Sequence, residues 1–537
     1  MTRLAQLAGV ALIGCLSVTT VTACSHSGAG GAAQGSSVLS IGIPEEPDTL
    51  DPQSTNAAVS RMVLRYAGDT LVSIDPKNNG KITEGLAKTW QASANGLQWT
   101  FDLKSGVKFQ NHDVMDAAAV VASFKRAMSP ATKAGTVSSV IKPIKQVHAE
   151  GASKVVFDLT HPYSLFLQNL ADPSASIVDA KAAQSAGKGF ARAPVLTGPW
   201  QVTQWVSGDH ITLTRNPDYA WGPPYAGTGP VKLSKLTFRI IPDDATQVAA
   251  LQSGEIQEST TVPTANMKAF ASNKSFTSYK YLRPGVGLFL EFNVTKAPFN
   301  DARVREALNY ALDKQQLVKV ALLGQGSPAC GPLPPSIPGY WSGICDYAPK
   351  YDPSRAKTLL AQAGWRAGAG GLLEKDGKPF QFTLYSSPTP ATWNSSAQLI
   401  QQQLQTVGIG VKIQNMEFGT LLSKTEAGED AAHLMGYTYN TADILDLWFR
   451  SSNSGTGLNL SHVKDARLDS MINQYQNQLT DSGRNAALIS LQKYISDQAL
   501  WVPLWNPDED IVTTTHLQGA QLSSLGYLVL NQAQLSS

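Results

Sequence analysis

The chain has 537 residues, of which 42% are hydrophobic and 16% are charged. This is enough apolar material for a large buried core, so a wholly disordered chain is excluded. The 43 lysines and arginines nearly balance the 41 aspartates and glutamates, which leaves a formal net charge of +2. That balance argues against nucleic acid as a partner, because such proteins present a strongly basic surface. At about 150 residues per domain, the length indicates two to four domains or two large lobes.

The first two dozen residues have the pattern of a secretory signal. Residues 1–3 contain a basic Arg3, residues 4–21 are mostly apolar, and small residues precede Cys24. This order is typical of a signal peptide, and residues 21–24 resemble a bacterial lipobox. We therefore predict a signal peptide at residues 1–23 and lipid on Cys24. A transmembrane anchor, or a signal peptide followed by an unmodified cysteine, remains the alternative.

Residues 24–37 are rich in Ser, Gly and Ala, a composition that behaves as a flexible tether. Two lipid chains give stable membrane attachment. No later stretch is long and apolar enough to cross a bilayer. The sequence therefore predicts a lipid-anchored protein on the extracytoplasmic face of the bacterial cell membrane, in the cell envelope or periplasmic space.

Hydrophobic periodicity predicts strands and helices along the rest of the chain. Strands are predicted at residues 38–43, 99–103, 154–159, 200–205, 210–215 and 235–240, and helices at residues 117–128 and 243–253. In the second half, Asn300 or Asp301 caps a predicted helix whose apolar stripe continues to Val318, and Asp352 and Pro353 open another that ends at Gly364. A strand at 380–385, a helix at 395–407 and a strand at 409–413 follow. Strand, helix and strand at this spacing indicate an α/β lobe with parallel strands.

Two cysteines have no place in the predicted signal and lipid site. Cys330 and Cys345 flank a loop that is rich in proline and glycine. In an oxidising compartment such a pair is predicted to form a disulfide, with a metal site as the alternative.

The chain lacks the common short motifs of enzymes. The chain has no His-Glu-x-x-His pair, no Gly-x-x-x-x-Gly-Lys-Ser/Thr loop, no Gly-x-Ser-x-Gly elbow and no Cys-x-x-Cys. His112 and Asp113 are adjacent, as a base and its orienting acid would be, but they fall in a predicted turn. We therefore predict that the protein is not an enzyme and has no catalytic residues, metal or cofactor.

Several blocks of the chain resemble family-5 extracellular solute-binding lipoproteins of ABC importers, the dipeptide/oligopeptide/nickel-binding protein family. The similar blocks lie, in the family's order, at residues 85–109, 197–200, 215–219, 250–256, 292–293, 301–311 and 351–357. The resemblance implies an α/β fold of the periplasmic-binding-protein type (type II, cluster C). Such a clamshell has two lobes, an inserted subdomain and a two-strand hinge.

On this chain the resemblance places lobe I at residues 38–75, 195–282 and 506–537, the inserted subdomain at 76–194, and lobe II at 283–505. The chain would cross between the lobes near residues 282–293 and again near 503–510. Two crossings let both lobes rotate about one axis. A ligand that contacts both lobes stabilises the closed form, which then docks on the permease.

The resemblance further implies capture of short peptides by a monomer that works with ABC permease subunits. In the family's peptide binders, a buried aspartate pairs with the α-ammonium of the ligand, and Asp443 is the candidate here. A desolvated ammonium needs such a partner. Alternation along an extended segment would bring Tyr439 and Thr441 to the same edge. From lobe I, the corresponding contacts would be Asn56, Ala57 and Ala58. An alternative role for Asp443 is a helix cap.

Further positions have two open interpretations. Arg283 lies beside the predicted hinge and would either bind the carboxylate of the ligand or bridge the lobes. Trp393 and Asn394 are predicted on a loop that faces the cleft, where Trp393 would form an apolar wall or simply pack. Ile444 and Leu445 replace the Tyr-Pro that is usual in the family after the aspartate. A haem, metal-chelate or sugar ligand, or a non-transporting regulatory lipoprotein, is therefore the alternative function.

Overall fold

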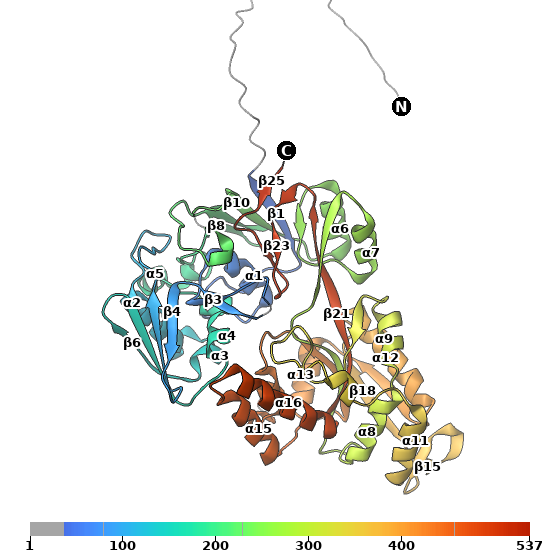
Figure 1. The fold of residues 1–537 in the computed structure, drawn as a ribbon. Coiled ribbons are helices and arrows are strands. Elements are labelled where there is room, and N and C mark those ends of the chain that lie inside the picture. Colours follow the sequence, from blue (N-terminus) through green and yellow to red (C-terminus); the bar gives the residue numbers. More distant parts are fainter. Residues whose placement is uncertain (1–36, 79, 228, 456, 537) are drawn as a thin grey trace, which may run out of the picture.

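The computed structural model describes residues 37–536 apart from positions 79, 228 and 456 (Figure 1). The predicted signal peptide, the tether up to residue 36, and Cys24 lie outside these described residues. Among the helices of the described ranges, none has both the length and the apolar character needed to cross a bilayer.

One long strand connects the two lobes of the clamshell. The first part of β21 (Trp501–Thr514) pairs with β13 (Val286–Phe292), and its last part pairs with β12 (Phe276–Leu282). Figure 1 shows β21 running from one lobe into the other. The chain also crosses at residues 283–285, between β12 and β13. The two-strand hinge that was predicted is therefore present in the fold.

A 12-stranded sheet passes through both lobes by way of β21. Its order is β19-β18-β20-β13-β21-β11-β1-β10-β9-β8, with β12 and β14 (Gly326–Pro328) also paired to β21. In lobe I, β1 (Val38–Ile43) runs parallel to β10 (Lys235–Ile240) and to β11 (Glu258–Ser259). The outer strands of this lobe are β9 (His210–Arg215) and β8 (Trp200–Val206).

The helices of lobe I cover this sheet. A separate core of this lobe contains β1 and α1 residues that include Leu39, Ile41, Val63 and Leu64. Its helices and remaining short strands are α1 (Ala58–Ala67), α6 (Asp244–Ser253), α7 (Thr264–Ser272), β22 (Leu517–Gln518), β23 (Gln521–Leu522), β24 (Leu528–Val529) and β25 (Gln534–Leu535).

The inserted subdomain has its own four-stranded antiparallel sheet, in the order β4-β5-β7-β6. Its strands are β4 (Ala87–Ala92), β5 (Gln98–Leu103), β6 (Ile144–Glu150) and β7 (Lys154–Leu159), with the small pair β2 (Val72–Ile74) and β3 (Ile82–Glu84) beside them. Its helices are α2 (Ala117–Met128), α3 (Ser138–Ile141) and α4 (Phe166–Leu170), and α5 (Ala180–Ala186) follows them. α2 has the predicted bounds, and the side chain of Asp116 caps it by accepting a hydrogen bond from the Ala119 amide at 2.9 Å.

Lobe II contains the predicted unit of two parallel strands and a helix. β18 (Gln381–Ser386) and β19 (Gly410–Asn415) pair in parallel and are connected by α12 (Ala391–Gln405). β20 (Ala432–Tyr437) joins β18 to β13. The other helices are α8 (Ala302–Ala311), α9 (Lys314–Ala321), α10 (Ile344–Tyr347), α11 (Pro353–Gln362), α13 (Phe418–Glu426), α14 (Ile444–Phe449), α15 (Ala466–Gln476) and α16 (Asp481–Asp497). A three-stranded sheet consists of β15 (Arg366–Ala367), β16 (Leu373–Lys375) and β17 (Lys378–Pro379).

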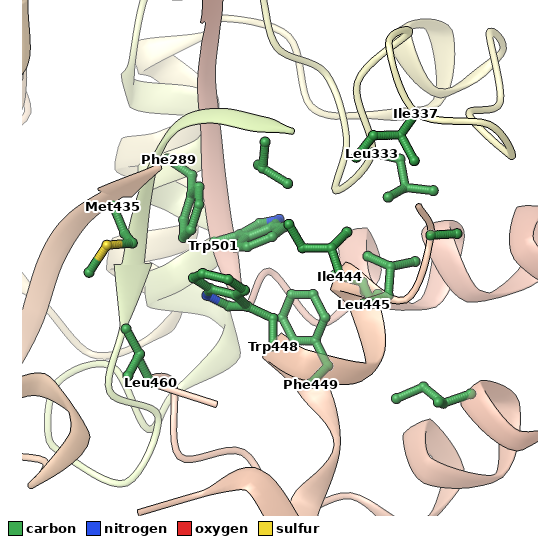
Figure 2. Close-up of a cluster of buried hydrophobic side chains, with 14 of the residues drawn as sticks. Phe289, Leu333, Ile337, Met435, Ile444, Leu445, Trp448, Phe449, Leu460 and Trp501 are labelled. Atoms are coloured by element: carbon green, nitrogen blue, oxygen red, sulfur yellow. The ribbon is translucent and has the colours of Figure 1, made fainter. Parts of the chain in front are cut away.

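An aromatic cluster packs the end of α14 against the sheet of lobe II (Figure 2). The ring centroids of Phe289 on β13 and Trp501 on β21 are 4.1 Å apart, and those of Phe449 and Trp501 are 4.8 Å apart. Phe449 and Trp448 come from α14 and are almost completely buried. Aromatic pairs at these separations add to the energy of burial. The cluster thereby holds α14 against this sheet.

Two predicted elements of lobe II are wrong in their extent. The single helix that was expected from Asn300 or Asp301 to beyond Val318 is broken into α8 and α9, because Asp313 caps a new helix by accepting a hydrogen bond from the Gln316 amide at 3.0 Å. α12 begins at Ala391, directly after Pro390. Trp393 and Asn394 are therefore helical residues and not part of a loop.

Cys330 and Cys345, which were predicted to pair, are joined by a disulfide bond. The bond closes a loop of lobe II that contains Ser336 and Pro338. Both of these residues line the cavity described below.

Candidate functional site

A cavity of about 330 Å³ lies where the two lobes, the inserted subdomain and the hinge meet. Its walls come from four parts of the chain. Lobe I contributes Ala58, Arg61, Met62 and Arg65 from α1, and the subdomain contributes residues that include Gln168, Asn169 and Asp172. The hinge contributes Tyr281, Arg283, Pro284 and Glu509, and lobe II contributes Ser336, Pro338, Thr438, Tyr439, Asn440 and Thr441. A ligand in this cavity would contact every part of the clamshell. Its volume is near the lower end of the range of about 300–1,000 Å³ that is usual for small-molecule sites.

The lobe II wall of the cavity is the segment between β20 and α14. Thr438 to Thr441 all line the cavity, and this includes the predicted contacts Tyr439 and Thr441. Only 6% of Thr441 is exposed, and its Oγ1 has no hydrogen-bond partner among the described residues. The Oε1 of Gln168, on the subdomain wall, is likewise buried without a partner. Unpaired buried oxygens of this kind are costly, so this wall suits a ligand with hydrogen-bond donors.

Asp443 does not line the cavity. The extended segment ends with β20 at Tyr437, and Asp443 has helical backbone angles of φ −63° and ψ −10°. The expected alternation of Tyr439, Thr441 and Asp443 along one edge is therefore broken, because strand periodicity does not extend into a turn. The helix-cap alternative is also wrong, since the side chain of Asp443 makes no capping hydrogen bond.

The carboxylate of Asp443 is instead bound by three side chains. Tyr163 of the inserted subdomain donates to Oδ2, while Tyr475 Oη at 2.9 Å and Gln476 Nε2 at 3.0 Å donate to Oδ1. Burial raises the pKa of Asp443 to about 6, and the nearby charge of Asp446 adds to this, while the hydrogen bonds from Gln476 and Tyr475 oppose it. The group thus lies at a contact between the subdomain and lobe II.

Other bonds cross the same contact, which we call the subdomain–lobe II seam: residues 163–164 and 169 against 443, 475–476 and 484. The Ser164 amide donates to the carbonyl of Gln476 at 2.7 Å, and the Ser164 hydroxyl donates to the carbonyl of Tyr475 at 3.0 Å. Arg484 donates to the carbonyl of Ser164 at 3.2 Å. Together with the hinge, this seam closes the space around the cavity.

The three lobe I residues predicted to contact the ligand are placed differently from one another. Ala58 lines the cavity. Asn56 is exposed, and Ala57 precedes α1 and is half-buried; neither is among the lining residues. The charged side chains that do line this wall, Arg61 and Arg65, were missed. Their spacing of four residues was a signal, because it places both on the same face of a helix, but no helix was predicted at α1.

Arg283, for which ligand binding and a bridge between the lobes were both open, makes an ion pair at the hinge. It lines the cavity, and its Nη1 lies 3.6 Å from Oε1 of Glu509 on β21. The ion pair therefore joins the two crossings of the hinge. Glu509 also accepts a hydrogen bond from Tyr281 at 2.8 Å.

Trp393 and Asn394 are not brought to the cavity. Trp393 is 5% exposed and packs edge-on against Phe418, with ring centroids 6.2 Å apart. The Oδ1 of Asn394 accepts a hydrogen bond from Asn415 at 2.8 Å. Both side chains thus fasten α12 to its neighbours.

A charged cluster lies inside lobe II, away from the cavity. His433 is bound at Nδ1 to Asp430 at 2.8 Å and at Nε2 to Glu291 at 3.1 Å, and all three side chains are fully buried. Burial lowers the pKa of His433, but the charges and hydrogen bonds of Asp430 and Glu291 outweigh burial and raise it to about 10. In the described part of the chain, no group of His, Cys, Asp and Glu is arranged to hold a metal ion.

Comparisons with known proteins agree with this architecture. The model of bacterial extracellular solute-binding proteins, family 5 Middle, matches residues 81–456. The glutathione-binding protein GsiB of Escherichia coli (strain K12) is 30% identical over 467 residues, 85% of this chain and 86% of that protein. GsiB of Salmonella typhi is 33% identical over 380 residues, 70% of this chain and 69% of that protein.

Solved structures show the same fold. The oligopeptide-binding protein AppA from Bacillus subtilis, in complex with a nonapeptide, has a TM-score of 0.75 and 25% identity, covering 94% of this chain and 100% of AppA. NikA from Brucella suis, in complex with Fe(III)-EDTA, has a TM-score of 0.80 and 24% identity, covering 93% of this chain and 100% of NikA. The chain therefore belongs to family 5 of the bacterial extracellular solute-binding proteins, and it is a substrate-binding protein of an ABC importer and not an enzyme.

Proposed function

We propose that this protein captures short peptides outside the cytoplasmic membrane and delivers them to an ABC permease by closing its two lobes around the ligand. The observation that carries the proposal is the cavity lined by both lobes, the subdomain and the hinge. Its volume of about 330 Å³ suits a ligand of two or three residues better than a long chain.

The lobe II wall supports a peptide in particular. Thr438 to Thr441 run through a stretch that is neither helix nor strand, and the hydroxyl of Thr441 has no hydrogen-bond partner among the described residues. A peptide main chain presents donors and acceptors at regular intervals and would pair with such groups. The unpaired Thr441 Oγ1 and Gln168 Oε1 would then gain partners.

The relatives support the same size of ligand. The two GsiB relatives described above are glutathione-binding proteins, and glutathione is a tripeptide. A dipeptide-binding protein from Pseudoalteromonas in complex with Met-Leu also shares the fold. A metal chelate remains the alternative, because three arginines line the cavity and NikA, with its Fe(III)-EDTA, has the same fold.

We further propose that Cys24 carries the lipid that anchors the protein to the membrane, that the protein is a monomer, and that its lobes divide at the boundaries predicted from the sequence. The signal pattern before Cys24 and the Ser/Gly/Ala tether after it support the anchor.

Mass spectrometry of the small molecules that co-purify with the protein tests the proposed ligand class. The protein is purified without denaturant, washed and then denatured, and the released molecules are identified. Short peptides are the expected result. A metal complex, a haem or a sugar as the only released ligand would overturn the peptide assignment.

A further inference from the structure

We infer that the peptide is acidic: α1 binds a second carboxylate of the ligand, in addition to its C-terminus, through Arg61 and Arg65, and Asp172 takes the ammonium of the ligand. This inference rests on the proposed function and names the charge of its ligand. It comes from the charges that the cavity presents and from three of them, Arg61, Arg65 and Asp172, that form no ion pair within the described residues.

Arg61 and Arg65 are four residues apart on α1, and both line the cavity. Arg61 donates through Nη1 to Thr136 Oγ1 at 2.9 Å and to the Asn56 carbonyl at 3.3 Å, and both acceptors are neutral. The guanidinium of Arg65 lies 3.8 Å from the ring centroid of Tyr527, and its Nε is buried without a hydrogen-bond partner. Within the described residues, neither arginine forms an ion pair.

The acid nearest in sequence is not available to Arg65. Asp69 is four residues further along the chain, but its carboxylate accepts hydrogen bonds from Tyr219 at 3.1 Å and from Trp221 at 3.3 Å. A partly buried guanidinium without a counter-charge carries a desolvation cost. A carboxylate of the ligand would remove that cost, since the planar fork of arginine matches a carboxylate in two parallel hydrogen bonds.

The cavity presents two carboxylates, and only one of them is free of a cation. Glu509 is paired with Arg283 and bound by Tyr281. Asp172, on the subdomain wall, accepts a hydrogen bond from the Ser174 amide at 2.9 Å and forms no ion pair within the described residues. It can therefore pair with an ammonium.

Asp443 is the competing ammonium partner, and its geometry disfavours that role. Its two oxygens already accept three hydrogen bonds, and it is absent from the cavity wall. With Asp172 pairing the ammonium and Arg283 held by Glu509, the two arginines of α1 leave the site with an excess of positive charge. A peptide with one acidic side chain balances that excess.

The test compares tripeptides that differ only by acid and amide. Titration calorimetry on the wild-type protein measures Ala-Glu-Ala against Ala-Gln-Ala, with the Glu/Gln pair also placed at the first and third positions. Because hydrogen bonds to charged groups are worth about 1.5–3 kcal/mol, we expect the best acidic peptide to bind about 10- to 100-fold more tightly than its amide counterpart. Glutathione, which carries two carboxylates and one ammonium, serves as a further probe.

Variants assign the preference to α1. Arg61→Gln and Arg65→Gln should each reduce the preference for acid over amide, while Arg355→Gln, the same change at an exposed position of α11, should leave it intact. Equal binding of acid and amide peptides to the wild type would overturn the inference and leave the proposed function standing. Failure of every peptide to bind would overturn the proposed function, and the inference with it.

Discussion

Tyr163 of the inserted subdomain donates a hydrogen bond to the buried carboxylate of Asp443 in lobe II. The phenol oxygen in turn accepts a hydrogen bond from Asn169 at 2.7 Å, and the second carboxylate oxygen is held by Tyr475 and Gln476. Because the partners come from two parts of the clamshell, this network forms only when the subdomain and lobe II are in contact. It therefore stabilises the closed arrangement around the cavity.

Removal of the Tyr163 hydroxyl should weaken ligand binding, although Tyr163 itself does not line the cavity. Tyr163→Phe keeps the ring but removes the donor to a charged group, a loss of about 1.5–3 kcal/mol to the closed form. We expect peptide affinity to fall by about tenfold or more in calorimetry. Tyr347→Phe is the matched control, because Tyr347 donates to Asp497 at 2.7 Å within lobe II. Equal affinities for wild type and Tyr163→Phe would show that the seam does not contribute to closure.

The charged cluster of lobe II predicts a pH dependence of stability. His433 has a pKa of about 10 when folded against an ordinary value of 6.5. Its contribution is therefore fully present below pH 6.5 and is lost as the pH rises through about 10. A pKa that folding raises by one adds about 1.4 kcal/mol to the free energy of unfolding while the group is protonated. The free energy of unfolding should therefore fall by a few kcal/mol over this window.

Urea denaturation at a series of pH values between 6.5 and 10 measures this dependence. His433→Gln should flatten the profile in that window, whereas His112→Gln, at an exposed surface position, should not. A wild-type profile that remains level up to pH 10 would contradict a charged His433.

Loss of the disulfide should affect both stability and binding. The double substitution of Cys330 and Cys345 by alanine opens a loop that spans 15 residues, for which chain entropy predicts a loss of about 3 kcal/mol. Ser336 and Pro338 lie in that loop and line the cavity, so peptide affinity should fall as well. Chemical denaturation and calorimetry measure the two effects. An unchanged denaturation midpoint in the variant would contradict the prediction.

The proposed lipid anchor makes a prediction about location. In cells that express the full chain, Cys24→Ser should move the protein from the detergent phase to the aqueous phase in a Triton X-114 separation. Cys15→Ser is the control, because residue 15 belongs to the segment that is predicted to be removed. Retention of the Cys24→Ser protein in the detergent phase would contradict the anchor.

Much of the fold was predictable because local patterns and tertiary packing agree. α2 (Ala117–Met128) and β1 (Val38–Ile43) have the predicted bounds, since their apolar periodicity coincides with the face that is buried. The break between α8 and α9 was not predictable from the same signal. Both helices bury apolar residues, so the stripe continues across Asp313, and only the capping geometry reveals the interruption.

The site was predictable as a segment but not residue by residue. From the resemblance, ligand contacts were predicted at Tyr439, Thr441 and Asp443, and the first two do line the cavity. The orientation of Asp443 depends on where β20 ends and on the position of α14, which the aromatic cluster around Trp501 sets. Such packing joins residues far apart in the sequence. For the same reason, the contact between Tyr163 and Asp443 could not be predicted from either residue alone.

Small-angle X-ray scattering of the purified protein, with and without the peptides that co-purify with it, tests closure of the lobes around a ligand most directly. We predict that saturating peptide reduces the radius of gyration of the wild type, and that Thr441→Trp, which fills the lobe II wall, abolishes this response. Scattering profiles of the wild type that stay identical with and without every co-purified peptide would contradict the account.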